Sequence, residues 1–280
     1  MPPEPEHPPA PPCGHSRVWE PTPFIRWSAG LHLGAAAWAL AQPESWPWAA
    51  GVVALDQAVL SLAGLWPRSR LLGSNWTRLP PAAAARGEIS LTFDDGPNPE
   101  TTPRVLDLLD AFGARASFFC IGTQARRHPA LCGEIVRRGH SVENHSLGHR
   151  WDFAFSGYRG FVREIAEAQA TLAEITGQAP RFFRAPFGIR NPLLEPALAH
   201  SGLQLASWTR RGFDTRECRP EIVLRRLTRN LAAGDILLLH DGHAARNADG
   251  QPVVLRVLPE LLGHIRSTGL RTVTLPHAQS

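Results

Sequence analysis

From residue 87 onward, apolar and polar positions follow two alternating periods along the chain. Short runs with a period of two predict strands at 88–93, 115–121, 140–143, 181–184, 203–208, 235–240 and 271–274. Between them, apolar residues three and four positions apart predict helices at 101–112, 123–138, 160–176, 192–201, 219–232 and 253–267. Alternating strands and helices imply a parallel sheet with right-handed crossovers, either open or closed into a barrel.

Two apolar runs precede this pattern, at residues 27–41 and 48–66, with a turn at 42–45 between them. Tryptophans lie near the ends of both runs, where membrane interfaces favour indole. Arginines flank the pair on both sides, whereas the turn carries only Glu44. By the positive-inside rule both flanks would be cytoplasmic. We therefore predict an apolar helical hairpin over residues 24–72 that anchors the chain in a membrane, with the C-terminal domain in the cytoplasm.

Two other interpretations of the apolar pair stay open. The first run would span only about 22 Å of a core about 30 Å thick, and a mid-membrane Asp56 would cost roughly 2.5–3.5 kcal/mol. The pair could therefore lie in the interface as a helical hairpin. Alternatively, Ala39-Leu40-Ala41 before Gln42 resembles a signal cleavage site, which would make the protein exported. The long Pro-rich stretch before the first run and the second run after it both count against a cleaved signal.

The composition of the remaining segments predicts how the chain is divided, and the distribution of its charges bears on nucleic-acid binding. Residues 1–23 contain nine prolines, which predicts a disordered tail. Residues 73–86 are predicted to be a linker, and residues 87–280 are long enough to form one catalytic domain. The sequence has no Lys and the 29 basic residues are scattered arginines, so the pI of about 9.3 does not indicate nucleic-acid binding. The four cysteines show no metal-binding or dense disulfide spacing.

Polar residues that are candidates for catalysis or metal binding fall repeatedly at the ends of predicted strands. Asp94 and Asp95 end the first strand, and His145 and His149 follow the third. Arg184 ends the fourth strand, Asp214 lies beyond the fifth, and His240 ends the sixth. In a barrel, the chemistry collects at the carboxyl ends of the strands. This repeated placement predicts a single site built from several strand ends.

Two of these clusters indicate a metal. His145 and His149 have the i, i+4 spacing that places two imidazoles on one face of a helical turn. Two adjacent carboxylates raise each other's pKa unless a cation separates them or an Arg holds one of them. One carboxylate with two His would leave coordination positions open for water and substrate, as catalytic metal sites require. Arg184 is then a suitable partner for the second carboxylate, and His240 a candidate general acid.

Four motifs in order resemble those of the polysaccharide deacetylases, the NodB-homology domains of carbohydrate esterase family 4. They are Thr-Phe-Asp-Asp-Gly at 92–96, His-Ser-Leu-Gly-His at 145–149, Arg-Ala-Pro-Phe-Gly at 184–188 and Leu-Leu-Leu-His-Asp at 237–241. The likeness covers about residues 87–275. It implies an α/β fold, a distorted (β/α)7 barrel, here preceded by the apolar helical hairpin. It also implies a divalent metal, usually Zn²⁺, and hydrolysis of an acetyl group, usually N-linked, on a sugar.

The resemblance assigns roles to individual residues. Asp95, His145 and His149 would bind the metal, and Asp94 would be the general base, kept ionised by Arg184. His240 would protonate the departing sugar amine. The backbone N–H of Phe187 would help to stabilise the oxyanion, and the side chains of Phe187, Trp208 and Arg211 would contact the substrate.

The family has a further motif, its fourth, which lies between the third and the last of those quoted above. It usually has a Trp and, three residues later, an Asp that supports the catalytic His, and the chain departs from the family at this motif. Here Trp208 is followed three residues later by Arg211, which cannot support an imidazolium. We predict that Asp214 takes over the support of His240 and that Arg211 faces the substrate or is structural.

Together these features predict a metal-dependent hydrolase that removes N-acetyl groups from an amino-sugar glycan. A place at the bacterial inner membrane would suit a lipid-linked or envelope polysaccharide precursor. Two alternatives remain at this point: a non-catalytic glycan-binding scaffold on the same barrel, or an amidase or deformylase of a non-carbohydrate amide.

Overall fold

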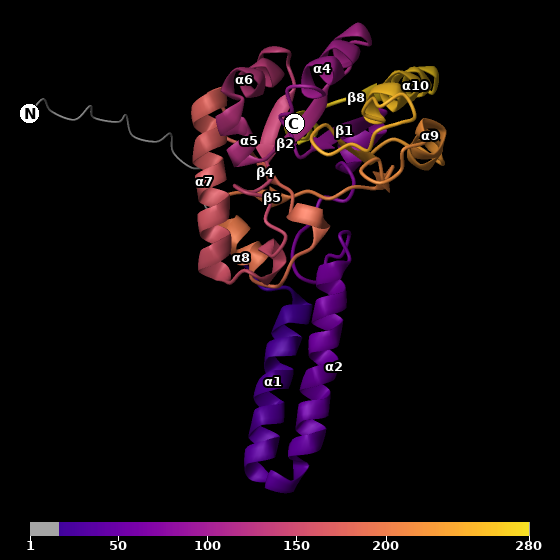
Figure 1. Cartoon of the computed structure of the whole chain (residues 1–280). Helices are drawn as coiled ribbons and strands as arrows, with labels where there is room; N and C mark the ends of the chain where they lie inside the picture. Colours follow the sequence, from indigo (N-terminus) through magenta and orange to yellow (C-terminus); the bar gives the residue numbers. More distant parts are fainter. Residues whose placement is uncertain (1–16, 280) are drawn as a thin grey trace, which may run out of the picture.

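The computed structural model describes residues 17–279, in which a helical hairpin projects from an α/β domain (Figure 1). The hairpin consists of α1 (Pro23–Ala41), the 3-10 turn η1 (Pro43–Ser45) and α2 (Trp46–Leu65). The strands are β1 (Glu88–Asp94), β2 (Ala116–Cys120), β3 (Ser141–Asn144), β4 (Phe182–Phe183), β5 (Gln204–Leu205), β6 (Arg210–Arg211), β7 (Ile236–His240) and β8 (Arg271–Thr272). The helices of the domain are α3 (Pro81–Ala85), α4 (Thr102–Ala111), α5 (Gly122–Arg127), α6 (Pro129–Arg137), α7 (Tyr158–Thr176), α8 (Leu194–His200), α9 (Pro220–Thr228), α10 (Val254–Ser267) and α11 (Leu275–Ala278).

The sheet is entirely parallel and follows the order β5-β4-β3-β2-β1-β7-β6, with β8 beside the start of β1. Helices surround it, so the predicted distorted (β/α)7 barrel is confirmed as a curled parallel half-barrel. One predicted helix differs: residues 123–138 form two helices, α5 and α6, because Pro129 cannot continue the first and begins the second.

The side chains of strand β1 point alternately into the hydrophobic core and toward the candidate site. Ile89, Leu91 and Phe93 join the hydrophobic cluster that includes side chains of α4, α9 and α10. The intervening Thr92 and Asp94 carry the polar groups that bond to Arg184. Because successive side chains of a strand point to opposite faces, one face of β1 stabilises the fold and the other supplies the site.

The segment at 73–86, predicted as a linker, is instead packed into the domain. Trp76 forms a parallel bridge with Ala206: its N–H donates to the Leu205 carbonyl (2.8 Å) and its carbonyl accepts from Ser207 N–H (2.8 Å). Further along, Leu79 N–H donates to the Gly234 carbonyl (2.8 Å), and the Leu79 side chain is buried. The segment lengthens the sheet beyond β5, which a Pro- and Ala-rich composition does not reveal.

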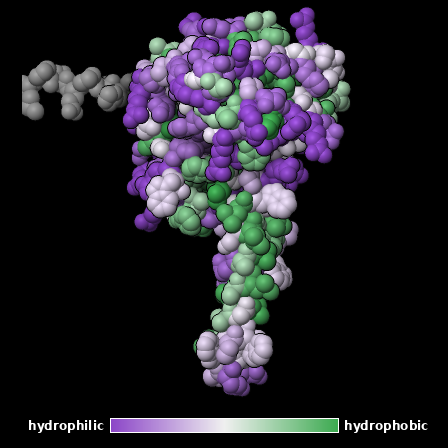
Figure 2. All heavy atoms as spheres, turned by 45° about the vertical axis from the view of Figure 1, so that its right-hand side comes forward, coloured by the Kyte–Doolittle hydropathy of each residue, from purple (hydrophilic) through white to green (hydrophobic). Residues whose placement is uncertain are grey.

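The hairpin is apolar on its outside, and the tip and the domain are more hydrophilic (Figure 2). Residues Pro43–Leu65 form one helical stretch that is long and apolar enough to cross a membrane, with mean hydropathy 1.5. Helix α1 has 19 residues, so it is longer than the apolar run at 27–41. At 1.5 Å per residue its length is about 28 Å.

Polar side chains inside the hairpin face one another. Ser28 Oγ donates to Asp56 Oδ2 (2.6 Å), and His32 Nδ1 lies 3.6 Å from the same oxygen. Asp56 is 3% exposed, so its carboxylate faces α1 rather than the surroundings. This pairing lowers the cost of an acidic residue within an apolar hairpin, because buried polar groups are tolerated where they find partners.

The predicted disordered tail lies mostly outside the described residues, which begin at Arg17. Arg17 is held on the domain: its N–H donates to the Ala199 carbonyl (2.8 Å), and its guanidinium lies 3.3 Å from Glu195. The base of the hairpin is fixed as well, since Arg190 N–H donates to the Gly64 carbonyl (3.1 Å).

Candidate metal centre and active site

The two carboxylates at the end of β1 are directed differently by a sharp turn. Asp94 is the last residue of the strand, and Asp95 has a positive φ of 73°. A left-handed conformation is one that Asp tolerates better than most residues. Gly242 allows the turn, because a Cβ there would lie 2.2 Å from the Asp95 carbonyl oxygen. Both side chains consequently line the same cleft, of about 650 Å³.

Asp95, His145 and His149 offer three ligand atoms that all lie within 4.8 Å of one another. Asp95 Oδ1 is 3.3 Å from Nε2 of His145 and 3.3 Å from Nε2 of His149. That oxygen is buried and accepts no hydrogen bond among the described residues. A buried carboxylate oxygen flanked by two imidazoles is the donor set of a catalytic divalent metal, so these residues fit such an ion.

The histidines present the correct nitrogen for this role. His145 Nδ1 is 2.8 Å from the Arg184 carbonyl, which can only accept, so Nδ1 carries the proton and Nε2 is free as a ligand. Burial lowers the pKa of His149 to about 4, which keeps this imidazole neutral. Burial alone would raise the pKa of Asp95, but the adjacent imidazoles of His145 and His243 hold it well below its ordinary value.

The two imidazoles are brought together by a loop and not by the helical turn that their spacing suggested. Residues 145–149 follow β3 without forming a helix, and Ser146 and His149 have positive φ of 64° and 47°. Ser146 Oγ accepts from His149 N–H (3.0 Å) and so helps to close the loop. The two histidines thus lie together as predicted by their spacing, but in a loop and not on a helical turn.

Arg184 lies at the centre of the barrel and is bonded at all three nitrogens. Nη1 donates to Asp94 Oδ1 (2.6 Å) and to Thr92 Oγ1 (2.8 Å). Nε and Nη2 donate to the carbonyls of Ala206 (3.1 Å) and Ser207 (2.9 Å). The guanidinium carbon is 4.0 Å from the ring centroid of Phe119. With 1% exposure, this cation is buried, but its ion pair and its hydrogen bonds offset the cost of burying the charge.

On the opposite side, Asp214 bonds to His240 twice. His240 Nδ1–H donates to Asp214 Oδ1 (2.9 Å), and its backbone N–H donates to Asp214 Oδ2 (2.8 Å). Burial on its own would lower the pKa of His240, but the Asp214 carboxylate outweighs it and raises that pKa to about 9. The structure therefore supplies His240 with a carboxylate partner, three residues beyond Arg211 along the chain.

The residues predicted to contact substrate form the rim of the cleft. Phe187, with a positive φ of 58°, lies with its ring centroid 4.8 Å from that of His149. The Arg211 guanidinium carbon lies 5.4 Å from the Trp208 ring centroid and 4.9 Å from that of Phe213. Within residues 17–279 the Arg211 side chain forms no ion pair, and its Nε is buried without a hydrogen bond.

One residue of the site was missed. His243 Nδ1 lies 3.1 Å from Asp95 Oδ2, the oxygen that does not face His145 and His149. His243 is largely exposed at the mouth of the cleft. The signal was the run from His240 to His243 just after a buried strand, in which only the first His was considered.

This fold and site define a class of protein: hydrolases whose cleft joins a carboxylate–histidine donor set to an Arg-held carboxylate and an Asp-supported His. A model of the family described as polysaccharide deacetylase matches residues 82–206. The chain is 33% identical over 189 residues to a peptidoglycan-N-acetylglucosamine deacetylase of Bacillus cereus, covering 67% of this chain and 85% of the relative. It is 36% identical over 168 residues to a chitooligosaccharide deacetylase of Sinorhizobium fredii, covering 59% and 76%.

Solved structures agree with the sequence relatives. The Bc1960 peptidoglycan N-acetylglucosamine deacetylase superposes with a TM-score of 0.65 at 26% identity, over 73% of this chain and 92% of that one. A family 4 carbohydrate esterase of Streptomyces lividans gives a TM-score of 0.60 at 29% identity, over 66% and 91%. The chain belongs to the polysaccharide deacetylase family, and both sequence relatives described above are carbohydrate deacetylases.

Proposed function

We propose that this protein is a metal-dependent deacetylase that removes N-acetyl groups from an amino-sugar glycan at a membrane surface. The observation that carries the proposal is the unbonded Asp95 Oδ1, 3.3 Å from both His145 and His149 Nε2. Asp95, His145 and His149 would hold a divalent ion, and their carboxylate and imidazole donors favour Zn²⁺. When bound, this ion would polarise the acetyl carbonyl and lower the pKa of the attacking water.

Asp94 would act as the general base. Its Oδ1 is occupied by Arg184 at 2.6 Å, whereas Oδ2 faces His145 Nε2 at 3.8 Å. The bonded oxygen orients the carboxylate, and the second oxygen can take a proton from the water that attacks the amide.

His240 would act as the general acid. It pairs with Asp94 across β1 and β7, so base and acid sit on neighbouring strand ends. Its Nδ1–H is held by Asp214, which leaves Nε2 to protonate the leaving sugar nitrogen. Phe187 N–H would contribute to stabilising the oxyanion, and Trp208 and Arg211 would contact the sugar from the rim.

The helical hairpin would place this chemistry at a membrane. One apolar stretch of spanning length and the interhelical partners of Asp56 support insertion of α1 and α2. Arginines on both flanks support a cytoplasmic domain at a bacterial inner membrane, the orientation suggested by the positive-inside rule. A lipid-linked or envelope polysaccharide precursor would then be the substrate. An exported orientation is the alternative.

Release of acetate from N-acetyl chitooligosaccharides, together with metal analysis of the purified protein, tests the proposal. We expect one divalent ion per chain and acetate release that is lost on chelation. His145→Ala should remove both the ion and the activity. His200→Ala, which changes an exposed His at the end of α8, is the matched control and should keep both.

The same experiment separates the other candidate functions. Glycan binding without acetate release by metal-loaded protein would identify a scaffold. Release of formate or of an acyl group from a non-carbohydrate amide, with chitooligosaccharides inert, would identify an amidase or deformylase. Full activity of the His145→Ala variant would exclude the proposed metal site.

A further inference from the structure

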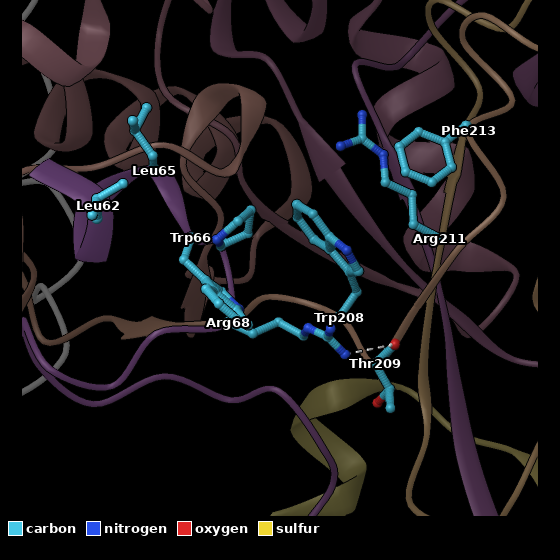
Figure 3. Close-up of a pocket in the computed structure, with 9 residues that line it drawn as sticks. Leu62, Leu65, Trp66, Arg68, Trp208, Thr209, Arg211 and Phe213 are labelled. Atoms are coloured by element: carbon cyan, nitrogen blue, oxygen red, sulfur yellow. Dashed lines mark hydrogen bonds between the residues drawn. The ribbon is translucent and has the colours of Figure 1, made fainter.

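A cavity of about 580 Å³ lies where the end of α2 meets the catalytic domain (Figure 3). We call it the α2 cavity. Leu62, Leu65 and Trp66 form its hairpin side, and Trp208, Arg211 and Phe213 form its domain side. Leu62, Leu65 and Trp66 are each more than half exposed. The cavity is therefore an apolar recess that opens beside the proposed membrane helix.

The α2 cavity adjoins the catalytic cleft. Trp208 and Arg211 line both spaces, so one indole and one guanidinium separate the end of α2 from the proposed metal ligands. The chain after α2 is fixed at this boundary, because Ser207 Oγ donates to the Pro67 carbonyl. Gly188 allows the close packing, since a Cβ there would lie 2.6 Å from the Trp208 ring and 3.0 Å from Pro67. A molecule could extend from the recess into the cleft along one continuous surface.

The boundary between the two spaces carries arginines that form no ion pair within residues 17–279. Arg211 has no ion pair within the described chain and a buried Nε without an acceptor. Arg68 makes only a long hydrogen bond to the Thr209 carbonyl (3.5 Å). Arg216, on the cleft side, is exposed and has no side-chain partner within residues 17–279. Three cations facing cavities suit an anion with several oxygens, because guanidinium groups bind phosphate through paired donors.

Aromatic side chains continue around the base of the hairpin. A second cavity on α2 is lined by Leu60, Trp151, Phe155 and Phe187. Trp151 is 80% and Phe155 84% exposed, which is unusual for large apolar side chains unless another apolar phase covers them. Aromatic residues of this kind concentrate at the interface of a membrane. Phe187 lines both this cavity and the catalytic cleft, so the cleft opens beside these aromatic side chains.

We propose that the α2 cavity binds the phosphate and the first hydrocarbon units of a lipid-linked glycan, whose sugar then lies in the catalytic cleft. Arg68 and Arg211 hold the phosphate, and Leu62, Leu65 and Trp66 contact the chain. The inference rests on the proposed deacetylase function and specifies its substrate as an amphiphile drawn from the membrane. Arg211, at the position where the family motif has an acid, has a binding role in this arrangement.

Two substrates with the same N-acetylglucosamine group test the inference with the full chain in detergent micelles. One is a soluble chitooligosaccharide, and the other carries the sugar on a polyprenyl pyrophosphate. We expect kcat/KM for the lipid-linked substrate to exceed that for the soluble one by about tenfold or more. Arg68→Gln and Leu65→Ser should each remove about fivefold or more of this advantage through KM. Neither change should alter the turnover of the soluble substrate.

Matched controls lie nearby. Arg70→Gln changes an exposed Arg on the same segment that does not line the α2 cavity, and Leu40→Ser changes an 83% exposed Leu at the far end of α1. Both should behave as the wild type with either substrate. A similar loss in these controls, or equal effects of Arg68→Gln on both substrates, would overturn the inference.

The remaining outcomes are also distinguishable. Deacetylation of the soluble substrate without any advantage for the lipid-linked one would refute the inference and leave the proposed function standing. No acetate from either substrate would count against the proposed function itself. Activation of soluble-substrate turnover by phosphatidylglycerol, lost in Arg68→Gln, would assign the cavity to bulk anionic lipid and would likewise overturn the inference.

Discussion

Replacing Asp214 with Asn tests whether this carboxylate supports His240. The variant keeps an oxygen that can accept from His240 Nδ1–H but removes the charge that raises the pKa of this imidazole to about 9. Without this carboxylate, burial is opposed only by the weaker attraction of Asp94 and Asp95, so the pKa should fall toward its ordinary value of about 6.5. A general acid must be protonated, and the alkaline limb of the pH–rate profile should therefore move to lower pH.

The size of the effect follows from the two pKa values. At pH 8, a group with a pKa of about 9 is roughly 90% protonated and one with a pKa of about 6.5 roughly 3% protonated, a loss of about 30-fold. At pH 6 the difference should nearly vanish, because both forms are then mostly protonated. The ratio of variant to wild-type turnover should thus fall steeply between pH 6 and pH 9.

The assay is kcat for acetate release from a chitooligosaccharide over this pH range, with Tm recorded for each protein. Asn also presents an amide donor toward the His240 N–H, so a loss of stability of about 1–3 kcal/mol is expected. Asp110→Asn, on the exposed side of α4, is the control and should leave the profile unchanged. A uniform loss of turnover at all pH values, with the alkaline limb of the pH–rate profile unmoved, would refute the support of His240 by Asp214.

Three further predictions concern the base, the neighbour of the metal ligands and the topology. Asp94→Asn should keep the ion but lower kcat by about 10²–10⁴-fold, measured with metal-quantified protein, since it removes proton abstraction alone; loss of the ion would mean that the two carboxylates exchange roles. His243→Ala should weaken metal retention against a chelator by about 10–100-fold, because it removes a partner of a ligating carboxylate; unchanged retention would leave His243 without that role. A reporter fused after Ser280 should indicate a cytoplasmic C-terminus, whereas soluble protein beginning at Gln42 would establish cleavage and export.

The fold and most of the site could be predicted because the strands that carry them are long or end in distinctive residues. Strands β1, β2 and β7 have five to seven residues each and are fully buried, so their apolar pattern is clear. Asp94, Asp95 and His240 follow directly from the ends of these strands. The motif order then identified the family, which the sequence relatives confirm.

The parts that differed depend on contacts between distant segments. Strand β6 consists of Arg210 and Arg211, so no apolar residue marks it in the sequence. Residues 73–86 join the sheet through the partners of Trp76 and Leu79, which come from 205–207 and 234. His243 contributes through a loop that brings it to Asp95, a contact that no local pattern encodes. Asp214 was proposed as the support of His240 only because it is close to Arg211 in the sequence. In the structure its carboxylate is hydrogen-bonded to His240.

The packing of residues 73–86 limits how far the catalytic cleft can move from the hairpin. As a free chain, 14 residues would give a root-mean-square reach of about 20 Å. Bonded at Trp76 and Leu79, with Pro67 held by Ser207, they give almost none. An enzyme held at one height above its anchor would modify the sugar unit nearest the lipid and leave distant units of a long polymer untouched. The expected product is a chain deacetylated at one defined end and not along its length.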